Sequence, residues 1–375
     1  MRFLCLVALL LSVPLGALTL SADERDELSR DLARWQTKFG NDDHVAKDKL
    51  PALQAANPYA TFSHLTKFAL LSDNEFSQFA SSPSPSPSLL PAALPAAATL
   101  NRSAVGGTGV DTVDWTTQST CVTPVKWMGK CRSDWAIAAA AAVSSAHCLA
   151  TSQFIDLSVQ QVLSCTYSSG LDSCWGPGTP FDGMQWLLER SSALCTEKAN
   201  PYTSGHSGVT PKCSDNTKCT RSISLYVGEI ERARGEAALE EQLRTQPVVA
   251  FATTNNYAWR LYTGGLLSWC PGGRLDQAVL VVGYGTEDVG YALPPVGFFK
   301  VRSAWGTDWG EHGDVRLARG PGTGDFGTCD IATHLVYPQR LPFRTKASDV
   351  ASTTAPHRPT PPASSRMSTA SDDES

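Results

Sequence analysis

The segment that most constrains the fold of this chain is residues 124–148, PVKWMGKCRSDWAIAAAAAVSSAHC. A glycine and a cysteine come first, and an alanine-rich run opened by Asp134 follows. Alanine has the strongest intrinsic helix propensity, and aspartate is favoured as an N-cap because its oxygen accepts bonds from unpaired backbone N–H groups. We therefore predict a largely buried helix from Asp134 to about Ala150, whose positive N-terminal end points at residues 129–134.

Length and charge limit the class of protein and its partners. A chain of 375 residues can hold one large domain plus appendages. Its formal net charge is −5, 18% of its residues are charged and it has no basic block, so we expect no nucleic-acid partner. In residues 1–20, Arg2 is followed by an apolar run and then by small residues. This order is typical of a cleaved signal peptide. No later stretch is apolar over the length of a membrane span, so we expect no span.

The cysteines indicate disulfides rather than metal. Of 11 cysteines, Cys5 lies in the signal segment, and the other 10 are an even number in a secretory context. Spacing alone does not give their connectivity. No C-x₂-C pair occurs, so we expect no metal site, and we expect no cofactor.

Composition divides the rest of the chain. Residues 81–112 are rich in Ser, Pro, Ala and Gly, which predicts a linker without a core. This linker contains Asn101-Arg102-Ser103, so Asn101 is a candidate N-glycosylation site. Residues 343–375 are rich in Ser, Thr and Pro and are predicted to form a disordered tail. The folded domain is then expected to cover residues 113–342.

The domain combines a helical half with a β half. Residues 113 to about 220 carry the helical pattern, and residues 157–165, LSVQQVLSC, are predicted to form a second helix capped by Ser158. Residues 222–342 contain five strand-like segments, which are PVVAFATT, LYTGGLLS, AVLVVGYG, GFFKVRSAWG and GDVRLARG. An α+β fold follows from this order of helices and strands.

Residues 124–148 also resemble the active-site segment of papain-family, cathepsin L-like cysteine proteases, whose local signature is C-G-[SA]-C-[WY]. The corresponding letters here are C-R-S-D-W, so Cys131 and Trp135 keep their family positions. Residues 261–285 and 304–320 carry the most specific further similarity. The resemblance covers residues 113–340 almost continuously. It implies a papain-like two-lobed α+β fold with disulfides, in which a helical lobe faces a β-barrel-like lobe across a cleft.

The residues that carry catalysis in this family are replaced here. The resemblance places Asp134 at the nucleophilic cysteine, Gln277 at the histidine, Ser303 at the orienting asparagine and Met128 at the oxyanion-hole glutamine. A carboxylate is a weak nucleophile toward an amide, and a glutamine cannot carry a proton at a useful pH. In another triad protease, loss of the nucleophile or the base costs ~10⁶ in rate. We expect no catalytic residues and no peptide hydrolysis by the papain mechanism.

The resemblance also implies a prosegment and three disulfides. Residues 21–80 are interpreted as a degenerate inhibitory prosegment, because residues 55–76 resemble its end in trypanosomatid cathepsin L-like enzymes while the preceding helix is shortened. The implied pairs are Cys131–Cys174, Cys165–Cys213 and Cys270–Cys329. The pairing of four cysteines stays open, and these are Cys121, Cys148, Cys195 and Cys219.

The candidate cleft differs from that of a protease. Trp127 and Arg132 are bulkier than the residues that the resemblance implies beside a substrate. Pro177, after Gly176, offers no N–H to substrate backbone, and one inserted residue in this loop leaves open whether Gly178 takes that place instead. Asp134 is interpreted mainly as a structural helix cap, which could also accept a bond from the Gln277 amide. The remaining candidate cleft residues are Trp135, Asp276, Trp305 and His334. We favour packing roles for Trp305 and for Trp309. The resemblance places His334, five residues after Cys329, at the base of the main specificity pocket, where a histidine is a weak indication of a preference for acidic or polar side chains.

Two classes of function compete at this point. The first is an inactive homologue that binds a peptide or protein, with protease inhibitors among the candidate partners. The second is a family enzyme with residual or altered peptide hydrolysis. The four replacements favour the first. A secreted or lysosome-like destination is expected, and the oligomeric state stays open.

Overall fold

The computed structural model describes residues 43–69, 71–80, 112–167, 172–176, 178–190, 194–213, 219, 223–290, 294–320, 322–323 and 326–342. The predicted signal peptide, the sequon at Asn101, nearly all of the linker, Pro177 and the predicted tail lie outside these residues.

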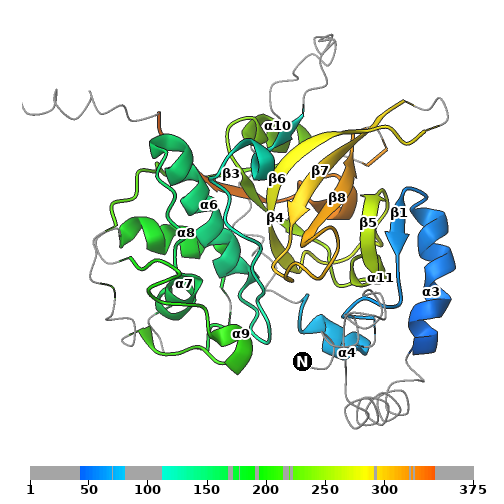
Figure 1. Ribbon diagram of the computed structural model, residues 1–375, viewed down its shortest axis with the longest axis horizontal. Coiled ribbons are helices and arrows are strands. Elements are labelled where there is room, and N and C mark those ends of the chain that lie inside the picture. The colour runs from blue at the N-terminus through cyan, green and yellow to red at the C-terminus, as the bar shows by residue number, and fades with distance from the viewer. Residues whose placement is uncertain are drawn as a thin grey trace, which may run out of the picture. The chain divides into compact units, whose positions relative to one another are not determined.

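The helical half is organised around α6 (Asp134–Thr151), which the alanine-rich segment forms as predicted. Nearly every α6 side chain is buried, because α7 (Val159–Cys165) and α8 (Pro180–Glu189) pack on one side and the sheet lies on the other (Figure 1). The small alanine side chains allow this close approach from several directions. The helix ends at Ser152, whose left-handed backbone and N–H bond to Cys148 terminate it.

One detail of the helix prediction is wrong. The N-cap is Ser133, which makes no side-chain capping bond, and Asp134 is the first residue of α6. The second predicted helix is confirmed as α7, and the Ser158 hydroxyl caps it by accepting a bond from the Gln161 N–H.

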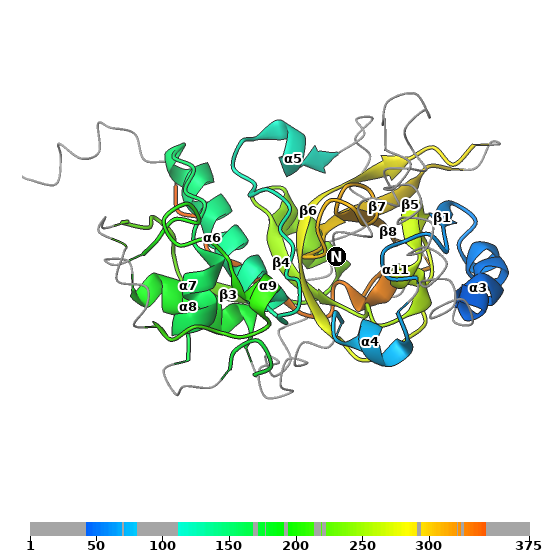
Figure 2. The ribbon, with the colours of Figure 1, turned by 60° about the horizontal axis from the view of Figure 1, so that its bottom comes forward.

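The β half is one sheet that, among the described residues, contains nine strands in the order β1-β5-β8-β7-β6-β4-β9-β3, with β2 pairing β6. The five predicted strand segments correspond to β4 (Val248–Ala252), β5 (Tyr262–Leu267), β6 (Gln277–Glu287), β7 (Val296–Arg302) and β8 (Asp314–Arg319). β4 and β6 pair antiparallel, as do β6 with β7 and β7 with β8, while β5 and β8 are parallel. Figure 2 shows this sheet facing the α6–α8 group.

The shorter elements complete the two halves. They are α3 (Asp43–Ala56), β1 (Ala60–Phe62), α4 (Asp73–Ser77), β2 (Val113–Asp114), α5 (Trp115–Gln118), α9 (Ser204–Ser207), β3 (Ile230–Ala233), α10 (Glu236–Leu243), α11 (Tyr257–Arg260), the 3₁₀ turn Thr328–Asp330 and β9 (Leu335–Pro338). None of the helices in the described part of the chain is both long enough and apolar enough to cross a membrane.

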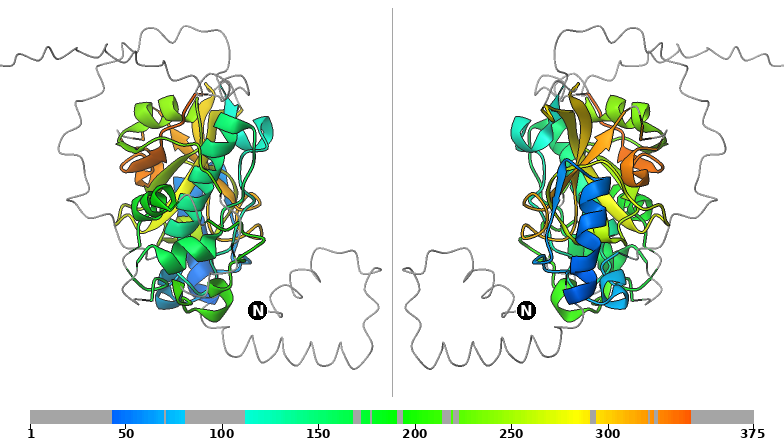
Figure 3. Two further views of the ribbon diagram at one scale, coloured as in Figure 1. Left: turned by 90° about the vertical axis from the view of Figure 1, so that its left-hand side faces the viewer. Right: turned by 90° about the vertical axis from the view of Figure 1, so that its right-hand side faces the viewer.

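Residues 43–80 pack on the β half rather than standing apart from it. β1 extends the sheet by pairing antiparallel with β5, and α3 runs along the outer side of this edge (Figures 1 and 3). Asn57 is completely buried there, and its side-chain oxygen accepts bonds from the N–H groups of Ser268 and Trp269. This segment is therefore continuous with the domain sheet.

Five disulfides lie in the folded part. The three pairs implied by the resemblance, Cys131–Cys174, Cys165–Cys213 and Cys270–Cys329, are all present. The four cysteines left open pair as Cys121–Cys148 and Cys195–Cys219.

Candidate functional site

The start of α6 and the start of β6 meet at the boundary between the two halves. Asp134, at the first position of α6, is only 2% exposed. Its Oδ2 accepts a hydrogen bond of 2.6 Å from the backbone N–H of Ala278 in β6. A carboxylate at a helix N-terminus is also favoured by the helix dipole. Asp134 therefore joins the helical half to the sheet.

Gln277, which immediately precedes Ala278, does not bond Asp134. Its side chain is fully buried, and neither its amide nitrogen nor its amide oxygen has a hydrogen-bond partner among the described residues. The expected Asp134–Gln277 side-chain bond is therefore wrong, because the backbone N–H of the next residue takes that place. An amide in this position can neither accept nor release a catalytic proton.

Ser303 and Met128 are the other two replaced positions that the resemblance implies, and both are buried. Ser303 is buried, and its hydroxyl has no bonding partner in the described part of the chain. Met128 is 1% exposed, and its backbone is fixed by its N–H bond to Ala304 and by the Tyr202 hydroxyl, which donates to its carbonyl. Its thioether is at most a weak acceptor. An oxyanion would find no side-chain donor at residue 128.

A second carboxyl, Asp276, lies within electrostatic reach of Asp134. Burial raises the pKa of Asp276 to about 6, with a smaller increase from the charge of Asp134, and three hydrogen bonds oppose the increase. The donors of these bonds are the N–H and hydroxyl of Thr254 and the N–H of Asn255. Because they hold both carboxylate oxygens, Asp276 is fixed in place.

Behind Asp134 lies a small cavity of about 20 Å³. Ser303, Ala278, Thr123 and Arg302 are among the residues that line it. Most of its lining is apolar, since Ile137, Val279 and Leu280 also contribute to it. It leaves no room for a ligand.

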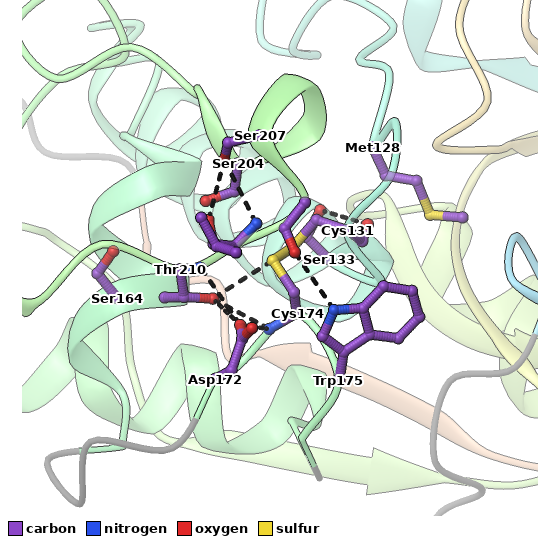
Figure 4. Close-up of a disulfide and its surroundings, with 12 residues drawn as sticks. Met128, Cys131, Ser133, Ser164, Asp172, Cys174, Trp175, Ser204, Ser207 and Thr210 are labelled. Atoms are coloured by element: carbon purple, nitrogen blue, oxygen red, sulfur yellow. Dashed lines mark hydrogen bonds between the residues drawn. A yellow bond between two sulfur atoms is a disulfide. The ribbon is translucent and has the colours of Figure 1, made fainter.

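Arg132, a predicted cleft residue, lies over the ring of Trp175. The Arg132 guanidinium carbon lies 4.9 Å from the centre of the Trp175 ring, and the Trp175 side chain is one of the few large apolar groups that are exposed. The Cys131–Cys174 disulfide joins the residues that precede them, and Figure 4 shows Trp175 beside this disulfide. Trp175 was missed in the sequence, although a tryptophan directly after a cysteine in a glycine-rich loop is a usable signal.

The other predicted cleft residues are distributed around this centre. Trp135 is buried, and Gly178 lies so close that an added methyl group would be 2.0 Å from its indole. Trp127 forms an isolated backbone bridge with Trp305, and its ring lies 5.5 Å from that of His206. Gly176 is half-buried. The close contact at Gly178 means that only a glycine fits against Trp135.

Trp305 and Trp309 are buried and pack against each other, as the sequence analysis predicts. Their ring centres are 4.9 Å apart, both are buried, and Trp309 stacks on Trp259. Trp305 also contacts Phe68 and Phe76 of the 43–80 segment, and its Nε1 donates to the Phe79 carbonyl. The cluster therefore extends from the domain into this segment.

His334 lies in the sheet half, in contact with the Phe251 ring. Its two nitrogens are buried without a bonding partner among the described residues, and burial lowers the pKa of the imidazole, with Arg234 adding to the effect. Neutral imidazole is therefore favoured. Within the described ranges, no group of three or more His, Cys, Asp or Glu side chains could hold a metal ion.

These features define a two-lobed α+β protein with disulfides, whose lobes meet at the N-terminus of a buried central helix. The model of the papain family cysteine proteases matches residues 110–339, so the chain belongs to that family. Among relatives, cysteine proteinase A of Leishmania mexicana is 30% identical over 269 residues, which is 72% of this chain and 71% of that protein. This relationship and the fold confirm the resemblance at the level of the family.

Many solved structures are similar to this one, and two of them serve as examples. Digestive procathepsin L 3 of Tenebrio molitor larval midgut has a TM-score of 0.61 at 23% identity, and the match covers 81% of this chain and 92% of that chain. A cysteine protease of Carica candamarcensis in complex with E-64 has a TM-score of 0.51 at 28% identity, and the match covers 62% of this chain and 99% of that chain. The match to the procathepsin covers more of this chain than residues 113–342. At 23% identity, it shows that the fold is shared and nothing more.

Proposed function

We propose that this papain-family chain is a protein without peptidase activity whose cleft binds a peptide or protein ligand. The observation that carries the proposal is the Asp134–Ala278 bond beside the unpartnered Gln277 amide. At the point where the family resemblance puts a thiolate and an imidazole, this chain has a carboxylate that holds a backbone N–H and an amide that cannot titrate.

The missing chemistry has three parts. Papain-like hydrolysis needs a strong nucleophile, an acid for the leaving amine and donors for the oxyanion. Asp134 is a weak nucleophile and is already hydrogen-bonded, Gln277 offers no acid, and Met128 offers no donor. Each loss alone is severe, and together they leave binding as the function that the cleft retains.

The contacts of residues 43–80 are consistent with an inert domain. Arg260 is 4% exposed, and its guanidinium donates to the carbonyls of Phe68 and Ala69 and pairs with Asp73. Removal of this segment would leave a buried arginine without those partners, which is costly. We infer that this degenerate prosegment stays in place as part of the fold, since the chain lacks the means to cleave it from itself.

The proposed ligand is a peptide or a protein, with protease inhibitors as one class. The similar Carica candamarcensis enzyme is solved in complex with E-64. An inactive homologue that keeps the papain-like frame could bind inhibitors without turning over substrate. The disulfides support the secretory pathway, and within it we propose a secreted or lysosome-like destination.

The direct test is hydrolysis of a fluorogenic Phe-Arg dipeptide by the purified protein between mildly acid and neutral pH. An epoxide-treated sample controls for contaminating cysteine protease. We expect no turnover, and we expect mass spectrometry to find no epoxide adduct at residue 134. Sustained turnover by the pure protein, or an adduct mapped to that residue, would contradict the proposal.

A second candidate function, altered hydrolysis, is favoured by one observation. The raised pKa of Asp276, about 6, puts a carboxyl that can be protonated within the field of Asp134. A carboxylic acid paired with a carboxylate can act as an acid and a base toward water. The three donors that fix Asp276 weigh against this role. Epoxide-resistant turnover that Asp276→Asn abolishes and Asp288→Asn preserves would establish it.

A further inference from the structure

Arg132 and Trp175 lie on two loops that are held firmly together. Beyond the Cys131–Cys174 disulfide, the Arg132 N–H donates to the Cys174 carbonyl over 3.1 Å. The Cys174 N–H is in turn held by the Asp172 carboxylate and the Thr210 hydroxyl, as the dashed bonds of Figure 4 show. The two side chains are therefore carried by a covalently joined and hydrogen-bonded pair of loops.

The Trp175 ring is oriented but leaves surface free. Its Nε1 donates to the Gly208 carbonyl over 3.2 Å, while 48% of the residue is exposed. Val209, next along the chain from Gly208, is 57% exposed. An exposed indole beside an exposed valine offers apolar contact to a ligand, which a lone surface arginine would not.

The Arg132 guanidinium has no counterion bonded to it. Among the described residues it makes no hydrogen bond or ion pair, and its Nε is buried without a partner. Asp134 attracts it at longer range, but the Oδ2 of that carboxylate is used by the Ala278 N–H. Burial lowers the pKa of Arg132 and the charge of Asp134 opposes this decrease, so the cation is partly desolvated.

We propose that Arg132 and Trp175 form a receptor for a carboxylate of a peptide bound in the cleft. This inference rests on the proposed binding function and names the chemistry of its ligand. A guanidinium that lies over an indole keeps its planar edge for a carboxylate, with which it can form two parallel hydrogen bonds. The exposed Trp175 ring supplies apolar contact beside that charge.

The carboxylate could come from an acidic side chain or from a peptide C-terminus. Fluorescein-labelled peptides separate the two sources: Ala-Leu-Leu-Glu-Ala-amide, its Gln analogue, and the Gln analogue with a free C-terminal carboxylate. Binding to the purified full protein is followed by fluorescence anisotropy at low and high salt. We expect at least one carboxylate peptide to bind about tenfold more tightly than the neutral amide, since a charge-assisted pair replaces a neutral contact.

Variants assign this preference to the two residues. Arg132→Gln should abolish it, Arg132→Lys should retain part of it, and Trp175→Leu should weaken binding of all three peptides. Lys198→Gln removes one charge at another exposed position and should keep the preference. The thermal unfolding midpoint of each variant shows whether it is folded, and Arg132→Lys keeps the test open if the neutral variant does not fold.

The two proposals fail in different ways. Equal affinity for carboxylate and neutral peptides, or a preference that survives Arg132→Gln, would overturn the carboxylate receptor and leave the binding cleft. Absence of binding by every peptide would likewise overturn the carboxylate receptor, whereas the proposed lack of peptidase activity is overturned by turnover of the Phe-Arg dipeptide.

Discussion

The carboxylate of Asp134 and the backbone N–H of Ala278 join the two lobes across 144 positions of sequence. The resemblance puts Asp134 where the family has its reactive thiolate, and here the same position accepts a hydrogen bond from the sheet. The Asp134 carboxylate holds the start of α6 against β6. The bond therefore gives Asp134 a role in holding the fold together.

Asp134→Ala should destabilise the protein by about 1–3 kcal/mol, because the Ala278 N–H is left buried and unpaired. Asp134→Asn keeps an acceptor oxygen and should cost less. Chemical denaturation of the two variants measures the difference. Equal free energies of unfolding for the alanine variant and the parent would show that the bond carries no stability.

Asp276 should make the protein less stable as the pH rises. Its pKa is raised from 3.8 to about 6 in the folded state, so the folded state binds this proton more tightly than the unfolded state. The resulting stabilisation is fully present below about pH 4 and is lost as the pH rises through about 6. The full change is on the order of 3 kcal/mol at 1.36 kcal/mol per pKa unit.

The measurement for Asp276 is the free energy of unfolding at several pH values from 4 to 7. Asp276→Asn should flatten the slope, and Asp288→Asn, at an exposed aspartate, should not. Asp134→Asn should move the midpoint of the slope to lower pH, because it removes a charge that raises the pKa of Asp276. A slope unchanged in Asp276→Asn would assign the pH dependence to other groups.

The sequence predicted the local structure of α6 better than the contacts of its first residue. The alanine run favours a helix through its local propensity alone, so the predicted end near Ala150 is close to the observed end of α6 at Thr151. The role of Asp134 depends on a backbone N–H from a distant strand, which no local pattern encodes. The pairing of Cys121 with Cys148 could not be predicted for the same reason. The spacing of cysteines along the sequence does not say which of them are close in the folded chain.

Asn57 should be a stability determinant of residues 43–80. Its side-chain oxygen accepts the N–H groups of Ser268 and Trp269, at 2.9 and 2.7 Å. Asn57→Ala removes both acceptor bonds and should cost about 1–3 kcal/mol. Asn74→Ala, at an exposed position in α4, is the matched control and should change little.

The same variant also tests whether this segment is integral to the fold. Hydrogen exchange of Asn57→Ala should show faster exchange in β5 as well as in β1, because the two strands pair. Loss of protection confined to residues 43–80 would show that the segment is docked on an independently stable domain.

Restoring two of the replaced residues should restore little activity. Asp134→Cys with Gln277→His supplies a nucleophile and a base, but Met128 still offers no oxyanion donor and Ser303 does not replace the orienting asparagine. Arg132, which lies over Trp175, is also bulkier than the residue that the resemblance implies beside a substrate. Hydrolysis of the Phe-Arg dipeptide should therefore stay far below that of an ordinary family member. Adding Met128→Gln should raise kcat more than it lowers KM, since an oxyanion donor acts in the transition state. High turnover by the first double variant would instead show that the cleft is still shaped for catalysis.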